Sequence, residues 1–206
     1  MPSLGFIFAD FRVFDVDGFS RRMEQIHRHI RPKLIRLGGQ LAPELAGMMR
    51  AEFFPHVARH ARRTVNPPPE TWVAFGTSPR GYKREAHFAL CVSRFGIHAR
   101  VIAAYESDRR AEMAARLRDH AAQLAKSFDR TRIERYDAWD FKRMPARAPA
   151  DRALFETLSE ELKKKAGGIN VGFGWPVREA LALERAELLD AYRELAPLYR
   201  VLCAES

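Results

Sequence analysis

The sequence predicts an α+β fold, in which an antiparallel sheet of about five or six strands is packed by about four to six helices. Strand-like segments follow one another between residues 71 and 105 with only short turns between them, which is typical of an antiparallel meander. Helix-like stretches flank this region on both sides. Because the 206 residues are 47% hydrophobic and show neither an internal repeat nor a linker, we expect residues 1–206 to form a single domain with one core.

The first predicted element, after an apolar lead-in, is a helix over about residues 19–37, where apolar side chains recur every three or four positions. Pro32 is expected to kink or split it. Gly38 and Gly39 are expected to end it, and a shorter helix is expected over residues 43–50.

The predicted sheet begins after a segment without a clear pattern, residues 51–70, which ends in a rigid run of three prolines. Residues 71–75 are β-branched and aromatic, and residues 78–81 carry the proline and glycine of a tight turn. Residues 87–92 and 97–105 complete the meander, and alternate residues of the last segment are apolar.

The second half alternates helices and strands in the same way. Its predicted elements are a long helix capped by Ser107 or Asp108, a strand over residues 131–139, a connector over 144–149, a helix starting at Asp151, a strand over 169–175 and a final helix opened by Pro176.

The composition favours a cytoplasmic protein with anionic partners. The chain has 35 Lys and Arg against 26 Asp and Glu, a net charge of +9, and nearly all of this surplus falls in residues 1–105. A basic face attracts nucleic acid, nucleotides or acidic metabolites, although a generally basic proteome would give the same total. No apolar run is long enough to span a membrane, the start does not resemble a signal peptide, and two cysteines are too few for a disulfide scaffold.

Basic, imidazole and phenol side chains cluster on the two sides of the first strand of the meander. We predict that His56, His60, Tyr82 and His87 supply acid–base chemistry and that Arg62, Arg63, Arg80 and Lys83 bind an anion. Guanidinium and ammonium groups bind phosphate or carboxylate, whereas His and Tyr can transfer protons. An ammonium beside a histidine also keeps its imidazole neutral near pH 7. These side chains are therefore expected to converge on a concave cationic hollow.

Two other interpretations of the cluster remain open. Glu52, His56 and His60 would share one helical face and could ligate a metal, but Pro55 and the many neighbouring cations oppose this. We therefore predict neither a metal nor a cofactor. Alternatively, the histidines have a structural role only, in the interior or on the surface of a helix, and the arginines form a solvated face.

Three further features are expected to be structural. Residues 167–174 are rich in glycine but lack the spacing of a phosphate loop, so a tight turn and a close-packed strand are expected. His98 and Arg100 should lie on the opposite face of their strand from its apolar residues, and Cys91 should lie in the core.

Residues 54–68 carry an unusual string, Phe-Pro-His-Val-Ala-Arg-His-Ala-Arg-Arg-Thr-Val-Asn-Pro-Pro, which continues through residues 71–75 and 80–83. In this string, and in its flanks at residues 31–34, 41–43 and 195–201, the chain resembles the bacterial YktB family. Ala86 stands before His87 where the resemblance leads us to expect a proline. The resemblance implies a compact α+β fold and a soluble bacterial protein, and it implies no activity.

The leading hypothesis is a protein that binds an anionic, phosphate- or carboxylate-bearing ligand in this hollow. If the protein is an enzyme, we expect metal-independent acid–base chemistry with a histidine as base and Tyr82 as proton donor. The alternatives are a nucleic-acid-binding module and an interaction protein for an acidic partner. No membrane partner is expected, and the sequence does not indicate an oligomeric state.

Overall fold

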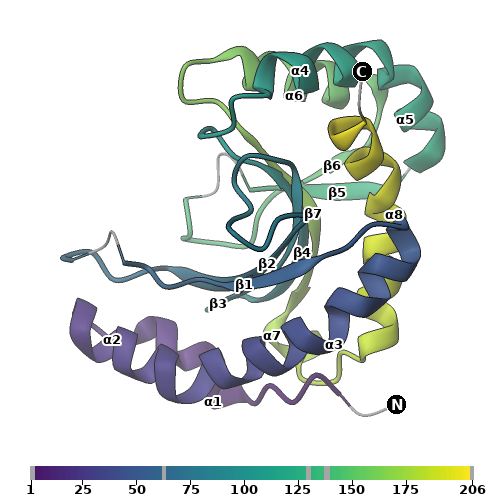
Figure 1. The fold of residues 1–206 in the computed structure, drawn as a ribbon. Helices are drawn as coiled ribbons and strands as arrows, with labels where there is room; N and C mark the ends of the chain where they lie inside the picture. Colours follow the sequence, from purple (N-terminus) through teal and green to yellow (C-terminus); the bar gives the residue numbers. More distant parts are fainter. Residues whose placement is uncertain (1–2, 62–63, 129–130, 137–139, 205–206) are drawn as a thin grey trace.

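The computed structural model describes residues 3–61, 64–128, 131–136 and 140–204. At its centre is one sheet in which every neighbouring pair of strands is antiparallel, in the order β1-β2-β3-β4-β7-β5-β6 (Figure 1). The strands are β1 Phe54–Val57, β2 Glu70–Gly76, β3 His87–Ser93, β4 Gly96–Ala103, β5 Arg132–Arg135, β6 Arg147–Pro149 and β7 Ile169–Pro176. The predicted α+β class and central meander are confirmed.

The sheet has seven strands, however, so the prediction of about five or six was too low. The two unpredicted strands, β1 and β6, lie at the two edges of the sheet and are four and three residues long. Each contains a proline, Pro55 or Pro149. Because proline donates no hydrogen bond, it is tolerated at sheet edges but weakens the sequence pattern of a strand.

The helices are α1 Phe8–Arg12, α2 Phe19–Gln25, α3 Arg31–Met49, α4 Arg110–Asp119, α5 Ala121–Phe128, α6 Arg152–Lys163, α7 Val177–Ala180 and α8 Arg185–Cys203. A π-helical turn, Ile26–Ile30, joins α2 to α3, and Pro32 lies in the first turn of α3. The helix is therefore irregular just before this proline, but the helical backbone is not interrupted from Phe19 to Met49. Asp151 caps α6 as predicted, because its carboxylate accepts a 2.9 Å hydrogen bond from the Leu154 amide.

The helix end predicted at Gly38 and Gly39 is wrong, because α3 continues through both glycines to Met49. A Cβ atom on Gly38 would lie 3.0 Å from the Cβ of Pro55 and 3.1 Å from a methyl of Val73. Gly38 therefore lets α3 approach the sheet closely, and it does not end the helix.

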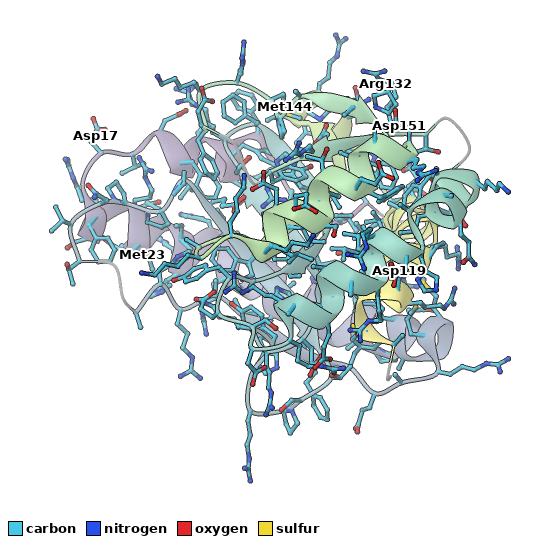
Figure 2. All side chains as sticks on the ribbon, turned by 90° about the horizontal axis from the view of Figure 1, so that it is seen from above. Asp17, Met23, Asp119, Arg132, Met144 and Asp151 are labelled. Atoms are coloured by element: carbon cyan, nitrogen blue, oxygen red, sulfur yellow. The ribbon has the colours of Figure 1, made fainter. Side chains whose placement is uncertain are left out.

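The helices cover one face of the sheet and one end of the molecule. Helix α3 packs on β1 and β2, and α8 packs mainly on β4 (Figure 1). Helices α4 and α6 lie side by side across the top of the view in Figure 1, and Figure 2 labels Asp119 at the end of α4 and Asp151 just before α6. Inward residues such as Phe75, Phe88 and Val101 have no exposed surface and form the core against these helices. Within the described chain, no helix combines the length and the apolar character needed to cross a membrane.

Candidate functional site

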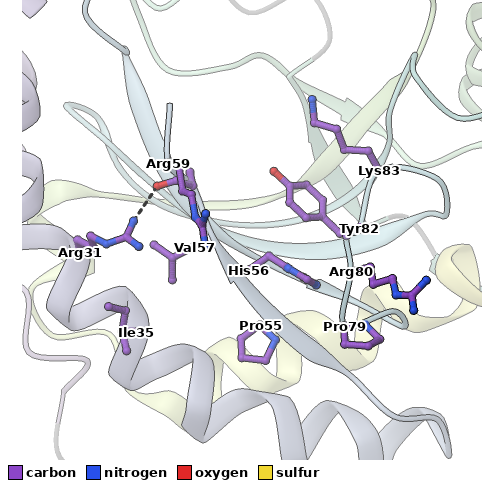
Figure 3. A pocket seen from close by; sticks show the side chains of 12 residues that line it. Arg31, Ile35, Pro55, His56, Val57, Arg59, Pro79, Arg80, Tyr82 and Lys83 are labelled. Carbon is purple, nitrogen blue, oxygen red and sulfur yellow. Dashed lines mark hydrogen bonds between the residues drawn. The ribbon is translucent and has the colours of Figure 1, made fainter. Parts of the chain in front are cut away.

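A hollow of about 710 Å³ opens where the edge strand β1 lies between α3 and the loop that joins β2 to β3. Its lining residues are Arg31, Ile35, Pro55, His56, Val57, Ala58, Arg59, Pro79, Arg80, Gly81, Tyr82 and Lys83. Figure 3 shows Arg31 and Ile35 on one side of it and Pro79 to Lys83 on the other. We call this cavity the cationic hollow.

The charged residues that the structure describes in the lining of the cationic hollow are all basic. Among the described residues, arginines or lysines stand at four lining positions, and none of the lining residues carries a carboxylate. The guanidinium of Arg31 donates a 3.1 Å hydrogen bond to the carbonyl of Ala58, which ties α3 to the end of β1 (Figure 3), and Lys83 pairs with Glu106. Within the described part of the chain, the exposed side chains of Arg59 and Arg80 have no hydrogen-bond or ion-pair partner. Their charges are available to an anion.

His56 is fixed in the wall of the cationic hollow. It lies on β1, and its Nε2–H donates a 2.9 Å hydrogen bond to the carbonyl of Ser78 in the facing loop. This bond leaves the other ring nitrogen, Nδ1, as an acceptor. The same loop is tightened by a 3.2 Å hydrogen bond from the Arg80 amide to the Ser78 hydroxyl, so strand β1 and the arginine-bearing turn are held together.

Tyr82 stands between the cationic hollow and a second cavity. Its ring lies 5.5 Å from that of His56 on one side and 4.7 Å from that of His87 on the other. Gly76 makes room for it, because a Cβ there would lie 2.7 Å from the Tyr82 Cβ. Burial raises the pKa of Tyr82, so the phenol keeps its proton. The Trp72 indole donates a 3.1 Å hydrogen bond to the Tyr82 oxygen, which leaves the phenol O–H to donate elsewhere.

The second cavity, of about 500 Å³, is the aromatic cavity. It is lined by Trp72, Tyr82, Lys83, His87, Ile102, Ala103, Ala104, Tyr105, Glu106, Tyr136, Ala166, Gly168, Ile169 and Asn170. His87 is only 2% exposed, and burial lowers its pKa to about 4, helped by the charge of Lys83. Its Nδ1–H donates to the carbonyl of Glu85 at 3.2 Å. His87 is therefore a neutral imidazole at pH 7.

The predicted site residues are only partly brought together. His56, Arg80, Tyr82 and Lys83 line the cationic hollow, whereas His87 lies beyond Tyr82 and lines the aromatic cavity. His60 lines neither cavity: its Nε2 is hydrogen-bonded to the Thr71 hydroxyl at 3.1 Å, and its ring meets Trp72 edge-on. The two remaining predicted ligand-binding residues, Arg62 and Arg63, lie outside the described residues.

Two of the cationic residues that line the hollow, Arg31 and Arg59, were not predicted from the sequence. Arg59 lies two residues after β1, within the basic segment of the predicted cluster, but was not singled out there. Arg31 comes from α3, far away in the sequence. In the sequence, Arg31 stands at the start of a helix whose apolar stripe faces the sheet and within the family-like flank 31–34. Neither feature specifies which residues it contacts.

A buried polar network on the sheet face away from the helices was also not predicted. Arg100 is fully buried, donates to both carboxylate oxygens of Glu70 at 3.0 and 2.6 Å, and lies 3.8 Å above the Tyr136 ring. The Tyr136 hydroxyl donates to Glu134 and lies 3.1 Å from His98 Nδ1. His98 and Arg100 do occupy the predicted strand face. Burial lowers the pKa of His98. Arg100 and His98 are fully buried, whereas Tyr136 also lines the aromatic cavity.

The helical arrangement considered for a metal is not formed, because His56 lies on an extended strand. Over the described ranges, no group of three or more His, Cys, Asp or Glu side chains is placed to hold a metal ion. The glycine-rich segment forms the close-packed strand that we predicted. A Cβ on Gly172 would lie 1.9 Å from the carbonyl oxygen of Ala99, and Cys91 is buried at the centre of the sheet.

Comparison with known proteins identifies the family of the chain. A family model described as a domain of unknown function, DUF1054, matches residues 6–199. A UPF0637 protein of Lysinibacillus sphaericus is 33% identical over 209 residues, which cover 98% of this chain and 97% of the relative. A UPF0637 protein of Bacillus velezensis is 33% identical over 212 residues, with 97% of each chain covered, and one of Bacillus cytotoxicus is 46% identical over 118 residues, or 56% of each chain. The predicted YktB resemblance is thus confirmed, and the chain belongs to the DUF1054 family.

Proposed function

We propose that the protein binds a small phosphate- or carboxylate-bearing ligand in the cationic hollow. The main support for this proposal is the lining of the cavity. As far as the structure describes the chain, it contains Arg31, Arg59, Arg80 and Lys83 and no carboxylate. Charges gathered in a concave site raise the local concentration of anions, and arginine forks bind phosphate and carboxylate through paired hydrogen bonds. The volume is in the range of small-molecule sites.

The cationic hollow also contains the two kinds of group that acid–base catalysis needs. The Nδ1 of His56 can accept a proton, and the hydroxyl of Tyr82 can donate one. His56 suits the role of base better than His87, because His87 lies behind the Tyr82 ring and is buried. If a reaction occurs in the hollow, we propose that His56 and Tyr82 carry it and that the arginines stabilise the developing negative charge.

Titration calorimetry with inorganic phosphate and with citrate, at constant ionic strength, tests the binding proposal. We expect binding to the wild-type protein and a loss of affinity of about three- to tenfold for each of Arg59→Gln and Arg80→Gln, because each substitution removes one charge-assisted contact. Arg178→Gln is the matched control, since Arg178 is exposed on α7 and does not line the hollow.

The salt dependence separates this proposal from nucleic-acid binding. A small anion makes few ionic contacts, so its affinity should fall gently as salt rises, whereas an oligonucleotide that neutralises many charges should show a steep slope. Absence of phosphate and citrate binding, or equal losses in Arg178→Gln and Arg80→Gln, would contradict the proposal.

A further inference from the structure

The two cavities are adjacent, and the residues that line them differ: basic residues gather in the cationic hollow, and aromatic and apolar residues in the aromatic cavity. They share Tyr82 and Lys83, and the Tyr82 ring is the wall between His56 on the cationic side and His87 on the aromatic side. A ligand anchored in one cavity therefore needs only a short spacer past Tyr82 and Lys83 to reach the other.

The aromatic cavity is not suited to an anion. In the described part of its lining the one cation is Lys83, which is paired with Glu106, another lining residue. The buried His87 is neutral at pH 7. An anion placed here would lie near the carboxylate of Glu106, and the described lining residues offer it no cation that is not already paired. The anionic part of a ligand therefore belongs in the cationic hollow.

The aromatic cavity is suited to a flat ring. Four aromatic side chains among the described residues line it: Trp72 from β2, and Tyr82, Tyr105 and Tyr136 from the segments that follow β2, β4 and β5. Aromatic faces stack on planar rings and tolerate many ring types. The remaining lining includes Ile102, Ala103 and Ala104, which add apolar contact.

The aromatic cavity also offers hydrogen bonds. Asn170 is among the lining residues, and its Oδ1 atom is buried with no hydrogen-bond partner in the described part of the structure. An unsatisfied buried carbonyl costs stability unless a donor reaches it. A side-chain amide can pair with the N–H and N or C=O groups on the edge of a heteroaromatic ring, so a nucleobase-like ring would satisfy it.

We infer that the ligand is a mononucleotide, held with its phosphate in the cationic hollow and its base in the aromatic cavity. This inference rests on the proposed function, because it assigns the anion to the same arginines. It extends that function by naming the second half of the ligand and the side chains that receive it.

The test compares three kinds of probe by titration calorimetry: inorganic phosphate, the four ribonucleosides and their 5′-monophosphates. We expect at least one monophosphate to bind about tenfold or more tightly than both phosphate and its own nucleoside, because the two halves are joined. Arg80→Gln should weaken phosphate and the monophosphate by a similar factor and should leave the nucleoside unchanged.

Two variants examine the aromatic cavity separately. Ala166→Phe adds a ring at an exposed turn residue of the cavity lining, and Asn170→Ala removes the carboxamide without filling space. Both should weaken the monophosphate several-fold and leave inorganic phosphate unchanged. Circular dichroism and the melting temperature of each variant show whether it is folded, and Arg178→Gln again serves as the control.

The outcomes separate the two proposals. If phosphate binds and depends on Arg80, but no monophosphate binds more tightly than phosphate, the mononucleotide inference is wrong and anion binding stands. The same holds if Ala166→Phe and Asn170→Ala leave the monophosphate affinity unchanged. If neither phosphate nor any monophosphate binds, both proposals are wrong.

Discussion

The indole N–H of Trp72 donates a 3.1 Å hydrogen bond to the hydroxyl of Tyr82. This bond fixes the loop between β2 and β3 to the face of the sheet, and it sets the position of the ring that separates the two cavities. The loop therefore contributes to both cavities, through Tyr82 and Lys83.

Tyr82→Phe should keep the ring in place and remove the acceptor of this bond. Because the half-buried Trp72 N–H would lose its partner, the free energy of unfolding should fall by about 1 kcal/mol. Urea denaturation of Tyr82→Phe, Trp72→Phe and the double variant measures this. The double variant should lose less than the sum of the two single losses, and strictly additive losses would show that the two groups do not interact.

Glu106→Gln should increase the affinity for inorganic phosphate. The carboxylate of Glu106 pairs with Lys83, and its neutralisation leaves the ammonium free to serve the cationic hollow. We expect a gain of about two- to fivefold in calorimetric titration, consistent with an exposed ion pair. Glu179→Gln, at an exposed position on α7, is the control with the same change of net charge. An equal gain in both variants would mean that only the net charge matters.

Stability should fall as the pH drops from about 6.5 toward 4, and His87 should account for part of the loss. Burial lowers the pKa of folded His87 from 6.5 to about 4, so the unfolded chain binds more protons than the folded protein in this interval. The contribution of the neutral, buried His87 to the free energy of unfolding is complete above pH 6.5 and is lost as the pH falls toward 4. Between pH 7 and pH 5 the cost from His87 is on the order of 1–2 kcal/mol.

Urea denaturation of the wild-type protein and His87→Gln at pH 7 and pH 5 measures this effect. The loss of stability between the two pH values should be smaller in the variant. Because His98 is also buried with a lowered pKa, some loss should persist in the variant. Identical losses in the two proteins would show that His87 takes up its proton as readily when folded as when unfolded.

The glycine pair in α3 should respond asymmetrically to alanine. A Cβ on Gly39 meets nothing within 4 Å, so Gly39→Ala should stabilise the helix by about 0.5–1 kcal/mol. A Cβ on Gly38 would lie 3.0 Å from Pro55 and 3.1 Å from Val73. Gly38→Ala should therefore raise the free energy of unfolding less than Gly39→Ala does, or lower it. Thermal denaturation of both variants decides this, and equal gains would mean that α3 does not approach the sheet as described.

Breaking the buried pair of Arg100 and Glu70 should be costly. Removal of one partner leaves a charge in a buried site, which typically lowers the free energy of unfolding by about 3–5 kcal/mol. We expect Arg100→Met and Glu70→Gln each to approach this loss and the double variant to lose less than their sum. Denaturant titration of the three proteins tests it, and a loss below about 1 kcal/mol for Arg100→Met would contradict a structural role.

The sequence predicted those parts of the fold that local pattern determines. Alternating apolar residues in β4 and the capping carboxylate of Asp151 were enough to place a strand and a helix start. The edge strands β1 and β6 were missed because they are short and carry prolines. The continuation of α3 through Gly38 depends on a contact with Pro55 and Val73, and a contact between distant segments leaves no local pattern.

The candidate site was predicted in part for the same reason. His56, Arg80, Tyr82 and Lys83 meet because the β2–β3 loop folds back toward β1, and their density along the chain indicated this. The order of residues along the chain does not show that His87 lies behind Tyr82 or that His60 is hydrogen-bonded to Thr71. Arg31 reaches the hollow from α3, and only tertiary packing brings it there.

The most direct test of the central claim is a crystal grown without sulfate or phosphate and soaked in tungstate, a heavy analogue of phosphate that scatters anomalously. The account predicts a tungsten peak in the cationic hollow, within hydrogen-bonding distance of Arg59 or Arg80. An empty hollow in a crystal that binds tungstate elsewhere, or in one that binds none, would contradict the account.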